Sequence, residues 1–463
     1  MDGLKTKVDK NHIQNIHDKT VWILENVGID FNHQKALEIF KSKGAKVQGQ
    51  RVFIDEKLLK EGLSTTVNQF TLKGSNRQVI FGTGKSVIAS SSKAVCILKE
   101  NQPSDPTIDD FIAIQKLNET SQVVDIVNSP AIMIKQIDKK NAAKIQTALT
   151  LKHTTKPIVG FCYTGDEAQD ALEIAKAFYD TDKDYYIMGV GNMISPLMYP
   201  KDLVDAMMVY AQYRQPLCLS ACSTPGITSP VTLAGTLVQN NAEILAGIVL
   251  MQLISPGTPL IYGNISFGCD MRYGSPAIGS IETNKMISYI KELASYYDLP
   301  CRAGGSLTDA KEIDWQGGVE SAMSLWTTLH NGIDFVFHGC GEMDSLNVLS
   351  MEKFVLDEVL IESIQRSLDQ KIVYDSAIDL ETIKRVGPGG DYAYEIQTSA
   401  QYREEHFIPD LYNRELYVHW KINGSQSIID HAKKVVQHRI ETYRLPNLDK
   451  RQKGIIEKIL SNL

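Results

Sequence analysis

Small polar and aromatic side chains recur where buried, strand-like segments of this sequence end. They are Ser91, Ser92, Cys162, Tyr163, Asn192, Cys222, Ser223, Asn264, Ser266, Phe267, Gly304, Gly305, Ser306, His338 and Gly339. Carboxylates are absent from this set, whereas a hydrolase or a metal-dependent aldolase normally places Asp, Glu or several His at its centre. The set favours binding of a small molecule by amides, hydroxyls, aromatic rings and one histidine.

Some of these positions admit two interpretations. His338 either binds a ligand or handles a proton, or it is a histidine satisfied by backbone partners. Tyr163 and Phe267 are candidate walls of a cage for a quaternary ammonium group, which aromatic faces attract, or they pack at the top of the fold. Cys218 and Cys222 are four residues apart across a strand end, which is poor metal-ligand geometry. We interpret them as small core residues and predict no directly bound metal.

The elements that must position these residues alternate regularly along the chain. The strand-like segments span Gln78–Ser91, Val123–Ser129, Pro157–Cys162, Tyr185–Val190, Pro216–Ala221, Leu260–Ser266, Leu299–Ala303 and Phe335–Gly339. Helical patterns lie between them at Asp166–Tyr179, Lys201–Tyr213, Asn240–Ile254, Glu282–Tyr297 and Gly318–His330. Strands alternating with helices indicate a parallel sheet, and eight units fit a closed barrel. We predict an α/β fold with a TIM (β/α)8 barrel over residues 78–345, whose active site lies where the strands end.

A doubly wound open sheet is the main alternative. Such a sheet usually carries a glycine-rich first turn, and Gly189-Val190-Gly191 does follow a strand. Ile194 stands where the third glycine of that fingerprint belongs, so the dinucleotide-binding motif is incomplete. The barrel is therefore the preferred prediction.

Two flanking regions complete the chain. Residues 1–77 mix helices with a short strand near Val52-Phe53-Ile54, and we expect an N-terminal α+β cap on the barrel. Residues 346–463 begin with a long helical pattern at about Met351–Asp369, continue through an aromatic-rich stretch and end in a charged helical tail. We expect them to form a C-terminal helical extension packed on the barrel.

Composition excludes several classes of function. The chain has 463 residues, 43% of them hydrophobic, and a formal net charge of −7, which argues against a nucleic-acid surface. Its seven cysteines are an odd number without a CxxC motif, as expected for a reduced cytosolic protein. The start of the chain lacks the apolar run of a signal peptide. The most lipid-like stretch, Ile244–Ile254, is too short to cross a bilayer, so we expect a cytoplasmic protein without a membrane partner.

Several blocks in a fixed order carry a resemblance to a known family. They are Gly304-Gly305-Ser306-Leu307-Thr308-Asp309-Ala310-Lys311, Asp314-Trp315-Gln316-Gly317-Gly318-Val319-Glu320, Phe337-His338-Gly339 running into Ser350-Met351-Glu352-Lys353-Phe354, the opening Ile16-His17 with Leu24-Glu25-Asn26-Val27-Gly28-Ile29, and the closing Pro409-Asp410-Leu411 with Arg414 and Trp420. These blocks resemble those of the trimethylamine methyltransferase family. The similarity extends over nearly the whole chain.

The resemblance implies a TIM barrel that passes a methyl group from a methylated amine to the cobalt of a separate corrinoid-binding protein. Trimethylamine-specific members carry pyrrolysine, whereas this chain contains only the standard twenty residues and so resembles the non-pyrrolysine branch. Known activities of that branch demethylate glycine betaine, proline betaine and carnitine. The expected cofactor is therefore a corrinoid, cob(I)alamin, carried by a partner protein, and a homo-oligomer is expected.

The chemistry of a quaternary amine agrees with the polar, acid-poor strand ends. Its nitrogen is already positive and leaves as a neutral amine, so the protein has only to orient the methyl group and exclude water. A betaine also needs its carboxylate recognised, for which His338, Arg302, Asn192, Asn264 or backbone N–H groups are candidates. Because Arg302 lies inside a strand, the alternative is that it is a buried residue with a structural role.

We therefore predict substrate contacts from Tyr163, Asn192, Asn264, Phe267, Arg302 and His338, without assigning a catalytic residue. Glycine betaine is the first candidate substrate and dimethylglycine its product. Two functions of other classes stay open, a metal-dependent barrel enzyme and a betaine-binding protein without methyl transfer.

Overall fold

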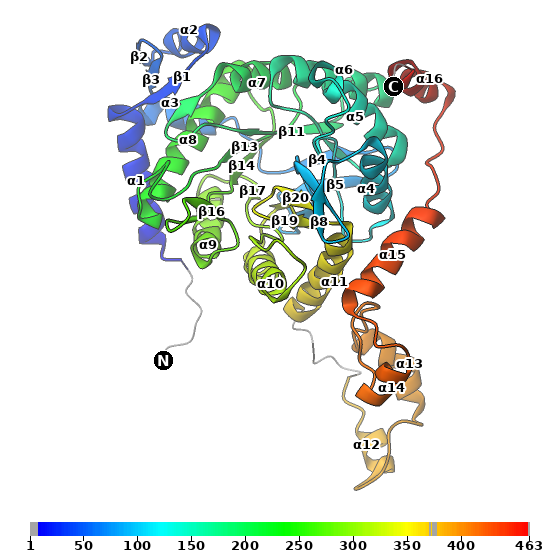
Figure 1. Ribbon diagram of the computed structural model, residues 1–463. Coiled ribbons are helices and arrows are strands. Elements are labelled where there is room, and N and C mark those ends of the chain that lie inside the picture. Colours follow the sequence, from blue (N-terminus) through cyan, green and yellow to red (C-terminus); the bar gives the residue numbers. More distant parts are fainter. Residues whose placement is uncertain (1–7, 370–371, 373–376, 462–463) are drawn as a thin grey trace.

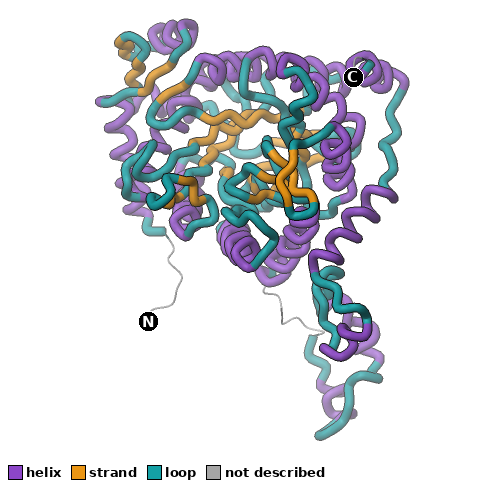
Figure 2. The backbone as a smooth tube through the Cα atoms, viewed as in Figure 1, coloured by secondary structure: helices purple, strands orange, loops and turns teal. Residues whose placement is uncertain are grey.

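Eight parallel strands form a barrel at the centre of the computed structural model, which describes residues 8–369, 372 and 377–461 (Figures 1 and 2). The strands, in spatial order, are β6 (Val87–Ile88), β18 (Phe335–Val336), β17 (Cys301–Arg302), β14 (Leu260–Asn264), β13 (Leu217–Ala221), β11 (Ile187–Asn192), β10 (Ile158–Val159) and β9 (Val127–Asn128). A parallel bridge between Ala89 and Ile126 joins the first and last of them and closes the barrel. Seven of the eight barrel strands fall inside segments that the sequence predicts, and β11 runs two residues beyond its segment, to Asn192. The predicted TIM barrel is confirmed.

One predicted segment contains two different elements. Gln78–Ser91 was expected to be a single strand, but only Val87–Ile88 joins the barrel. Its beginning is β5 (Gln78–Phe81), which pairs antiparallel with β4 (Phe70–Lys73). The apolar side chains of this hairpin pack into the barrel interior, where the ring of Phe81 meets that of Phe335 at 5.5 Å. The hairpin closes the barrel at the end where the strands begin, which leaves the opposite end as the mouth.

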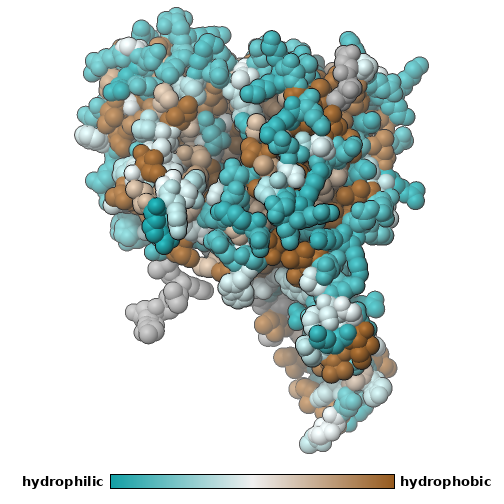
Figure 3. Space-filling view, in the orientation of Figure 1, coloured by the Kyte–Doolittle hydropathy of each residue, from teal (hydrophilic) through white to brown (hydrophobic). Residues whose placement is uncertain are grey.

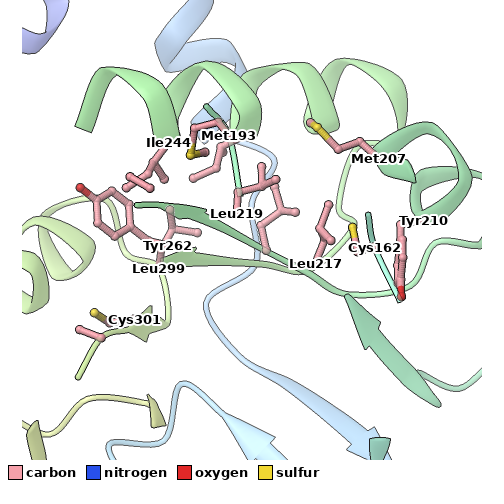
Figure 4. Close-up of a cluster of buried hydrophobic side chains, with 14 of the residues drawn as sticks. Cys162, Met193, Met207, Tyr210, Leu217, Leu219, Ile244, Tyr262, Leu299 and Cys301 are labelled. Atoms are coloured by element: carbon pink, nitrogen blue, oxygen red, sulfur yellow. The ribbon is translucent and has the colours of Figure 1, made fainter. Parts of the chain in front are cut away.

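Helices cover the outside of the barrel, one after each strand. They are α4 (Ile108–Thr120), α5 (Lys139–His153), α6 (Gly165–Tyr179), α7 (Lys201–Tyr213), α8 (Leu233–Ile254), α9 (Ile281–Tyr296), α10 (Trp315–His330) and α11 (Met351–Leu368). Leu217 and Leu219 of β13 pack against Met207 of α7 and Ile244 of α8 in the layer between strands and helices (Figure 4). By length and composition α8 could cross a membrane, but 83% of its most apolar window is buried inside the protein.

The N-terminal region lies against α8. Its elements are α1 (Lys10–Asn26), β1 (Ile29–Phe31), α2 (Gln34–Ser42), β2 (Lys46–Gln48), β3 (Arg51–Phe53) and α3 (Glu56–Leu63). The helices α1 and α3 contact α8, and β1 pairs with β12 (Met198–Tyr199) from the loop after β11. This loop of the barrel is therefore tied to the N-terminal sheet.

The C-terminal region leaves the barrel and returns to it. The short helices α12 (Leu380–Val386), α13 (Ile396–Glu405) and α14 (Tyr417–Ile422) project beyond the barrel, whereas α15 (Ile428–Thr442) and α16 (Lys450–Leu460) lie on it (Figure 1). Arg439 of α15 pairs with Glu358 of α11 and donates to the carbonyl of Leu117. The division of the chain near residues 77 and 345 stays a proposal, because β4 and β5 pair across the first of these boundaries.

At the mouth, loops that are distant in sequence are joined by a small sheet. Its strands are β7 (Cys96–Lys99) and β8 (Gln102–Ser104) from the loop after β6, and β19 (Glu342–Met343) and β20 (Val348–Leu349) from the loop after β18. A second hairpin, β15 (Gly268–Asp270) with β16 (Ser275–Ala277), follows β14. These pairings fix the residues that follow the barrel strands.

Candidate active site

Arg302 points into the barrel because of its register. The pairing of neighbouring strands places Arg302, Gly263 and Ser220 side by side on the inward row. Gly263 has no side chain, and a Cβ there would lie 2.8 Å from the Cβ of Ser220. Arg302 reaches across this gap and donates from Nη1 to the Ser220 hydroxyl at 3.2 Å. The glycine therefore makes room for a guanidinium inside the barrel.

No carboxylate pairs with this buried guanidinium among the described residues. Arg302 is 2% exposed, its Nε has no hydrogen-bond partner, and its charge lies 5.3 Å from the centre of the Phe337 ring. Burial lowers the pKa of Arg302, but a guanidinium titrates so high that the side chain stays positive. Buried charges are normally paired, so an unpaired one at the end of a barrel strand marks a site for an anion.

His338, whose pKa is lowered by burial and in part by Arg302, lies against a buried glutamate. Nδ1 of His338 is 2.7 Å from Oε1 of Glu342, and the same oxygen accepts the backbone N–H of Ser92 at 2.9 Å. Glu342 is fully buried, and its Oε2 has no partner among the described residues. Burial lowers the pKa of His338, and Arg302 adds to this effect, whereas Glu342 opposes it. A neutral His338 donates from Nδ1 to Glu342 and keeps a lone pair on Nε2.

The backbone at His338 is as unusual as its side chain. His338 has a φ of +65°, a region that side chains other than glycine rarely adopt. Such residues persist where the surrounding structure holds them, and they concentrate at functional sites. Here the Gly339 N–H donates to the carbonyl of Ala89 and the His338 carbonyl accepts the Ser306 N–H.

A lysine occupies the face of Tyr163. The ammonium of Lys93 is 3.4 Å from the centre of that ring, and the Phe161 ring meets Tyr163 edge-on at 6.1 Å. Burial lowers the pKa of Lys93 and raises that of Tyr163. The predicted cation-binding ring therefore does contact a cation, but one that belongs to the chain itself.

Six of the fourteen buried side-chain atoms that lack a hydrogen-bond partner among the described residues lie near the mouth of the barrel. Besides Arg302 Nε and Glu342 Oε2, they include the hydroxyls of Ser90, Ser91 and Ser129 and Oδ1 of Asn128. All lie at or just beyond the ends of barrel strands or in the loop after β18. Buried polar groups almost always find a partner in a folded protein, so these six atoms are candidates for contact with a polar ligand.

The other predicted contacts are not all brought to this group. Asn192 is exposed and continues the inward row beside Ser220. Asn264 instead faces α8, because its amide donates to Asn240 and its oxygen accepts the N–H of Ser266. Phe267 packs in a separate apolar cluster with Ile265, Ile278 and Leu307.

The structure also describes the two cysteines that could have formed a metal pair. Cys218 lies in the barrel core, and burial raises the pKa of its thiol to about 12. Cys222 is half-buried at the strand end. Among the described residues, no three His, Cys, Asp or Glu side chains are grouped so that they could hold a metal ion.

Comparison with known proteins now identifies the family. Residues 4–460 match the family described as trimethylamine methyltransferase (MTTB). The chain belongs to the trimethylamine methyltransferase family. It is 34% identical to a proline betaine:corrinoid methyltransferase of Eubacterium limosum, over 98% of this chain and 96% of that protein. It is 32% identical to the glycine betaine methyltransferase of Desulfitobacterium hafniense (strain Y51), over 89% of this chain and 87% of that protein.

A solved structure supports the fold of this methyltransferase. The monomethylamine methyltransferase of Methanosarcina barkeri superposes with a TM-score of 0.54, covering 96% of this chain and 94% of that one at 10% identity. At this identity the likeness concerns the fold alone.

Two residues of the candidate site, Glu342 and Lys93, are not among those predicted from the sequence. Glu342 follows His338 by four residues, in a segment that the sequence assigns to no strand. Its spacing from a strand-end histidine is the one available signal. Lys93 directly follows two serines at the end of the first strand, but an isolated lysine there is indistinguishable from a solvated surface residue.

Proposed function

We propose that this methyltransferase moves a methyl group from a zwitterionic quaternary amine to Co(I) of a corrinoid held by a separate protein. The observation that carries the proposal is that two buried side chains of opposite charge each have an atom without a hydrogen-bond partner among the described residues. Arg302 offers Nε to an anion, and Glu342 offers Oε2 to a cation. A betaine, which holds a carboxylate and a quaternary ammonium in one small molecule, matches both.

We assign to Arg302 the role of binding the substrate's carboxylate. A guanidinium donates several N–H groups in one plane and matches a carboxylate well. His338 suits this role less, because its Nδ1 is engaged with Glu342 and its neutral Nε2 repels an anion rather than donating to it. Trimethylamine has no carboxylate and would leave Arg302 unpaired, so the site favours betaines.

We assign the substrate's ammonium to Glu342 and to the face of Tyr163. A strongly anionic pocket would hold the charged substrate better than the transition state, in which the positive charge fades. In this site Glu342 shares Oε1 with His338 and the Ser92 N–H, which disperses its charge. The Tyr163 face contributes a weaker attraction once Lys93 moves away from it.

The reaction then needs no acid or base from the protein. The electron pair of Co(I) forms the new cobalt–carbon bond with the methyl group. The carbon–nitrogen bond breaks, its electron pair stays on nitrogen, and a neutral tertiary amine leaves. The protein contributes orientation of the methyl group toward the mouth and exclusion of water.

Glycine betaine is the first candidate substrate, with proline betaine, carnitine or another quaternary amine as alternatives. The test mixes the purified chain with free cob(I)alamin and each compound in turn, and follows the absorbance of methylcobalamin together with the demethylated amine. We expect methyl transfer from at least one betaine and none from trimethylamine. Failure of every quaternary amine would refute the proposal.

Two further measurements, combined with this assay, distinguish the rival functions. A betaine-binding protein would bind the ligand in calorimetry without forming methylcobalamin. A metal-dependent barrel enzyme would contain stoichiometric metal in elemental analysis and lose activity on chelation. We expect neither outcome.

The partner is proposed to dock over the mouth, since the cobalt must reach the methyl group there. Exposed apolar side chains occur in the loops after β13 and β14, namely Ile227, Val231, Met271 and Tyr273. We propose that these loops contact the corrinoid protein and that the reaction takes place in the cytoplasm.

A further inference from the structure

A buried ion pair near the start of α11 takes no part in the chemistry proposed above. Nζ of Lys353 is 2.9 Å from Oδ1 and 2.7 Å from Oδ2 of Asp357, one turn further along the helix. Their exposed fractions are only 4% and 3%. Other polar and charged residues of the mouth loops stay in water, since residues 99–102 are exposed and Figure 3 shows mainly hydrophilic side chains over β8.

Stability alone does not explain why this pair is buried. Moving two charges out of water costs as much as their attraction contributes, and apolar residues of similar volume often replace such a pair without loss. Charged hydrogen bonds are short and directional, so a buried pair is suited to holding its neighbours in fixed positions. The groups that Lys353 and Asp357 contact therefore indicate their role.

The pair contacts two separate loops of the mouth. Lys353 donates to the hydroxyl of Ser306 at 2.8 Å, in the loop after β17. Asp357 accepts the backbone N–H of Gly341 at 2.8 Å, in the loop after β18. Ser306 is itself fully buried. One turn of α11 thus joins the loop after β17 to the loop after β18.

Each of these loops is continuous with a charged residue of the candidate site. Arg302 ends β17 four residues before Ser306, and Glu342 directly follows Gly341. Both act on the same ring, because burial lowers the pKa of His338, Arg302 adds to this effect and Glu342 opposes it. The distance between the guanidinium and the carboxylate therefore depends on how the two loops are held together.

Two glycines let the loops approach closely. Gly305 has a φ of +140°, and a Cβ there would lie 2.7 Å from the carbonyl oxygen of His338. Gly341 has a φ of +90°, and a Cβ there would lie 3.1 Å from the carbonyl oxygen of Ser350, which caps α11. The Ser306 N–H donates to the His338 carbonyl at 2.9 Å. The loops are thus packed backbone to backbone, and the ion pair holds both.

We propose that Lys353 and Asp357 are positioning residues that set the distance between Arg302 and Glu342, and with it the length of the substrate. This role rests on the proposed function, in which Arg302 binds the carboxylate and Glu342 the ammonium of one zwitterion. A betaine of matching length contacts both residues at once. A shorter or longer one leaves a buried charge without its partner, which weakens binding.

The test uses three trimethylammonium carboxylates, with one, two and three methylene groups between the nitrogen and the carboxylate carbon. Selectivity is the ratio of kcat/KM, measured with free cob(I)alamin, between the best and the poorest compound. We expect at least about tenfold for the wild type. The double variant Lys353→Met with Asp357→Leu removes both charges together and should fold. Its selectivity should fall to about twofold, and kcat/KM for the best compound should drop about tenfold.

A second Lys–Asp pair provides the matched control. Lys291 donates to Asp334 at 2.7 Å, and this buried carboxylate also accepts a backbone N–H, that of Cys301, at 3.0 Å. Asp334 directly precedes β18, so the pair lies at the barrel end opposite the mouth. Lys291→Met with Asp334→Leu should keep both kcat/KM and selectivity within about twofold of the wild type.

A smaller change tests the same role if the double variant does not fold. Ser306→Ala keeps the ion pair, removes one of its contacts and should lower selectivity roughly threefold. A folded variant that loses kcat/KM by the same factor for all three compounds would overturn the proposal, because a structural role alone has that effect. A wild type that accepts all three lengths equally well would overturn it too.

Calorimetric binding of the same compounds distinguishes failure of the positioning role from failure of the proposed function. In a wild type that binds betaines but transfers no methyl group, the proposed function is wrong, and the ratio of Kd values in the same variants decides the positioning role. Methyl transfer with unchanged selectivity in the variants would refute the positioning role alone. A wild type that binds none of the three compounds would refute both.

Discussion

The buried charge of Arg302 destabilises the fold, and we explain its presence by its proposed role in binding the substrate's carboxylate. A buried charge without a partner destabilises the fold, and an apolar residue of similar length removes that penalty. We therefore expect Arg302→Met to raise the free energy of unfolding by about 1–3 kcal/mol while the KM for betaine increases roughly 30-fold or more, the equivalent of losing a buried charged hydrogen bond. Urea unfolding and the cob(I)alamin assay measure the two effects. Cys301→Ala, in the neighbouring buried position, should leave KM unchanged. A variant that loses stability with KM intact would make Arg302 purely structural.

Lys93 competes with the substrate for the face of Tyr163. Its ammonium lies 3.4 Å from the ring centre, where the substrate's ammonium is proposed to sit. A cation–π contact contributes about 1 kcal/mol, so Lys93→Met should lower the KM for betaine about fivefold with kcat little changed. Lys93→Arg keeps the cation and should behave like the wild type. Steady-state kinetics with cob(I)alamin decide the matter. A higher KM in Lys93→Met would instead mean that Lys93 holds the carboxylate.

Among the secondary-structure elements, the C-terminal extension contacts a histidine whose protonation depends on pH. His153 ends α5, and the hydroxyl of Tyr443, just after α15, donates to the His153 carbonyl at 2.8 Å and lies 3.3 Å from the ring atom Nδ1 of His153. Burial lowers the pKa of His153 to about 4, with Lys152 and Lys116 adding to the effect. The unfolded chain binds a proton near pH 6.5 and the folded one does not, so the native state loses about 3 kcal/mol as the pH falls from 6.5 to 4.

Thermal unfolding across this pH range tests the contact of α5 with the extension. The melting temperature of the wild type should fall between pH 6.5 and pH 4, and that of His153→Gln should fall less. The comparison of the two proteins removes the contributions of all other titrating groups. If the melting temperatures of the two proteins fall in parallel, His153 takes up a proton as readily in the folded state as in the unfolded state, and its pKa is not lowered.

The same elements show which features sequence reasoning can reach. Apolar runs of strand length, separated by helical patterns, are local signals, and all eight barrel strands overlap the predicted segments, with only β11 extending beyond its own. The direction in which the Glu342 side chain points cannot be predicted from neighbouring residues. It is set by the pairing of β20 with β7, about 250 residues away in sequence. Asn264 lies at a strand end as predicted, but the alternation of side chains turns its amide toward Asn240 of α8. The β4–β5 hairpin resembles a barrel strand because it too buries one apolar face.

For the whole molecule, ligand binding should couple the separate loops of the mouth to global stability. The proposed site draws Arg302 from β17, Glu342 from β19 and Tyr163 from the loop after β10. A betaine that bridges them binds only the folded state, and at a hundred times its Kd it stabilises that state by about 2.7 kcal/mol. For 463 residues this corresponds to a rise in melting temperature of roughly 3 °C. Trimethylamine and free acetate, which each carry half of the betaine, should give almost no rise at the same concentration. An equal rise with trimethylamine would show that the ammonium alone is recognised, and the role of Arg302 in holding the carboxylate would be wrong.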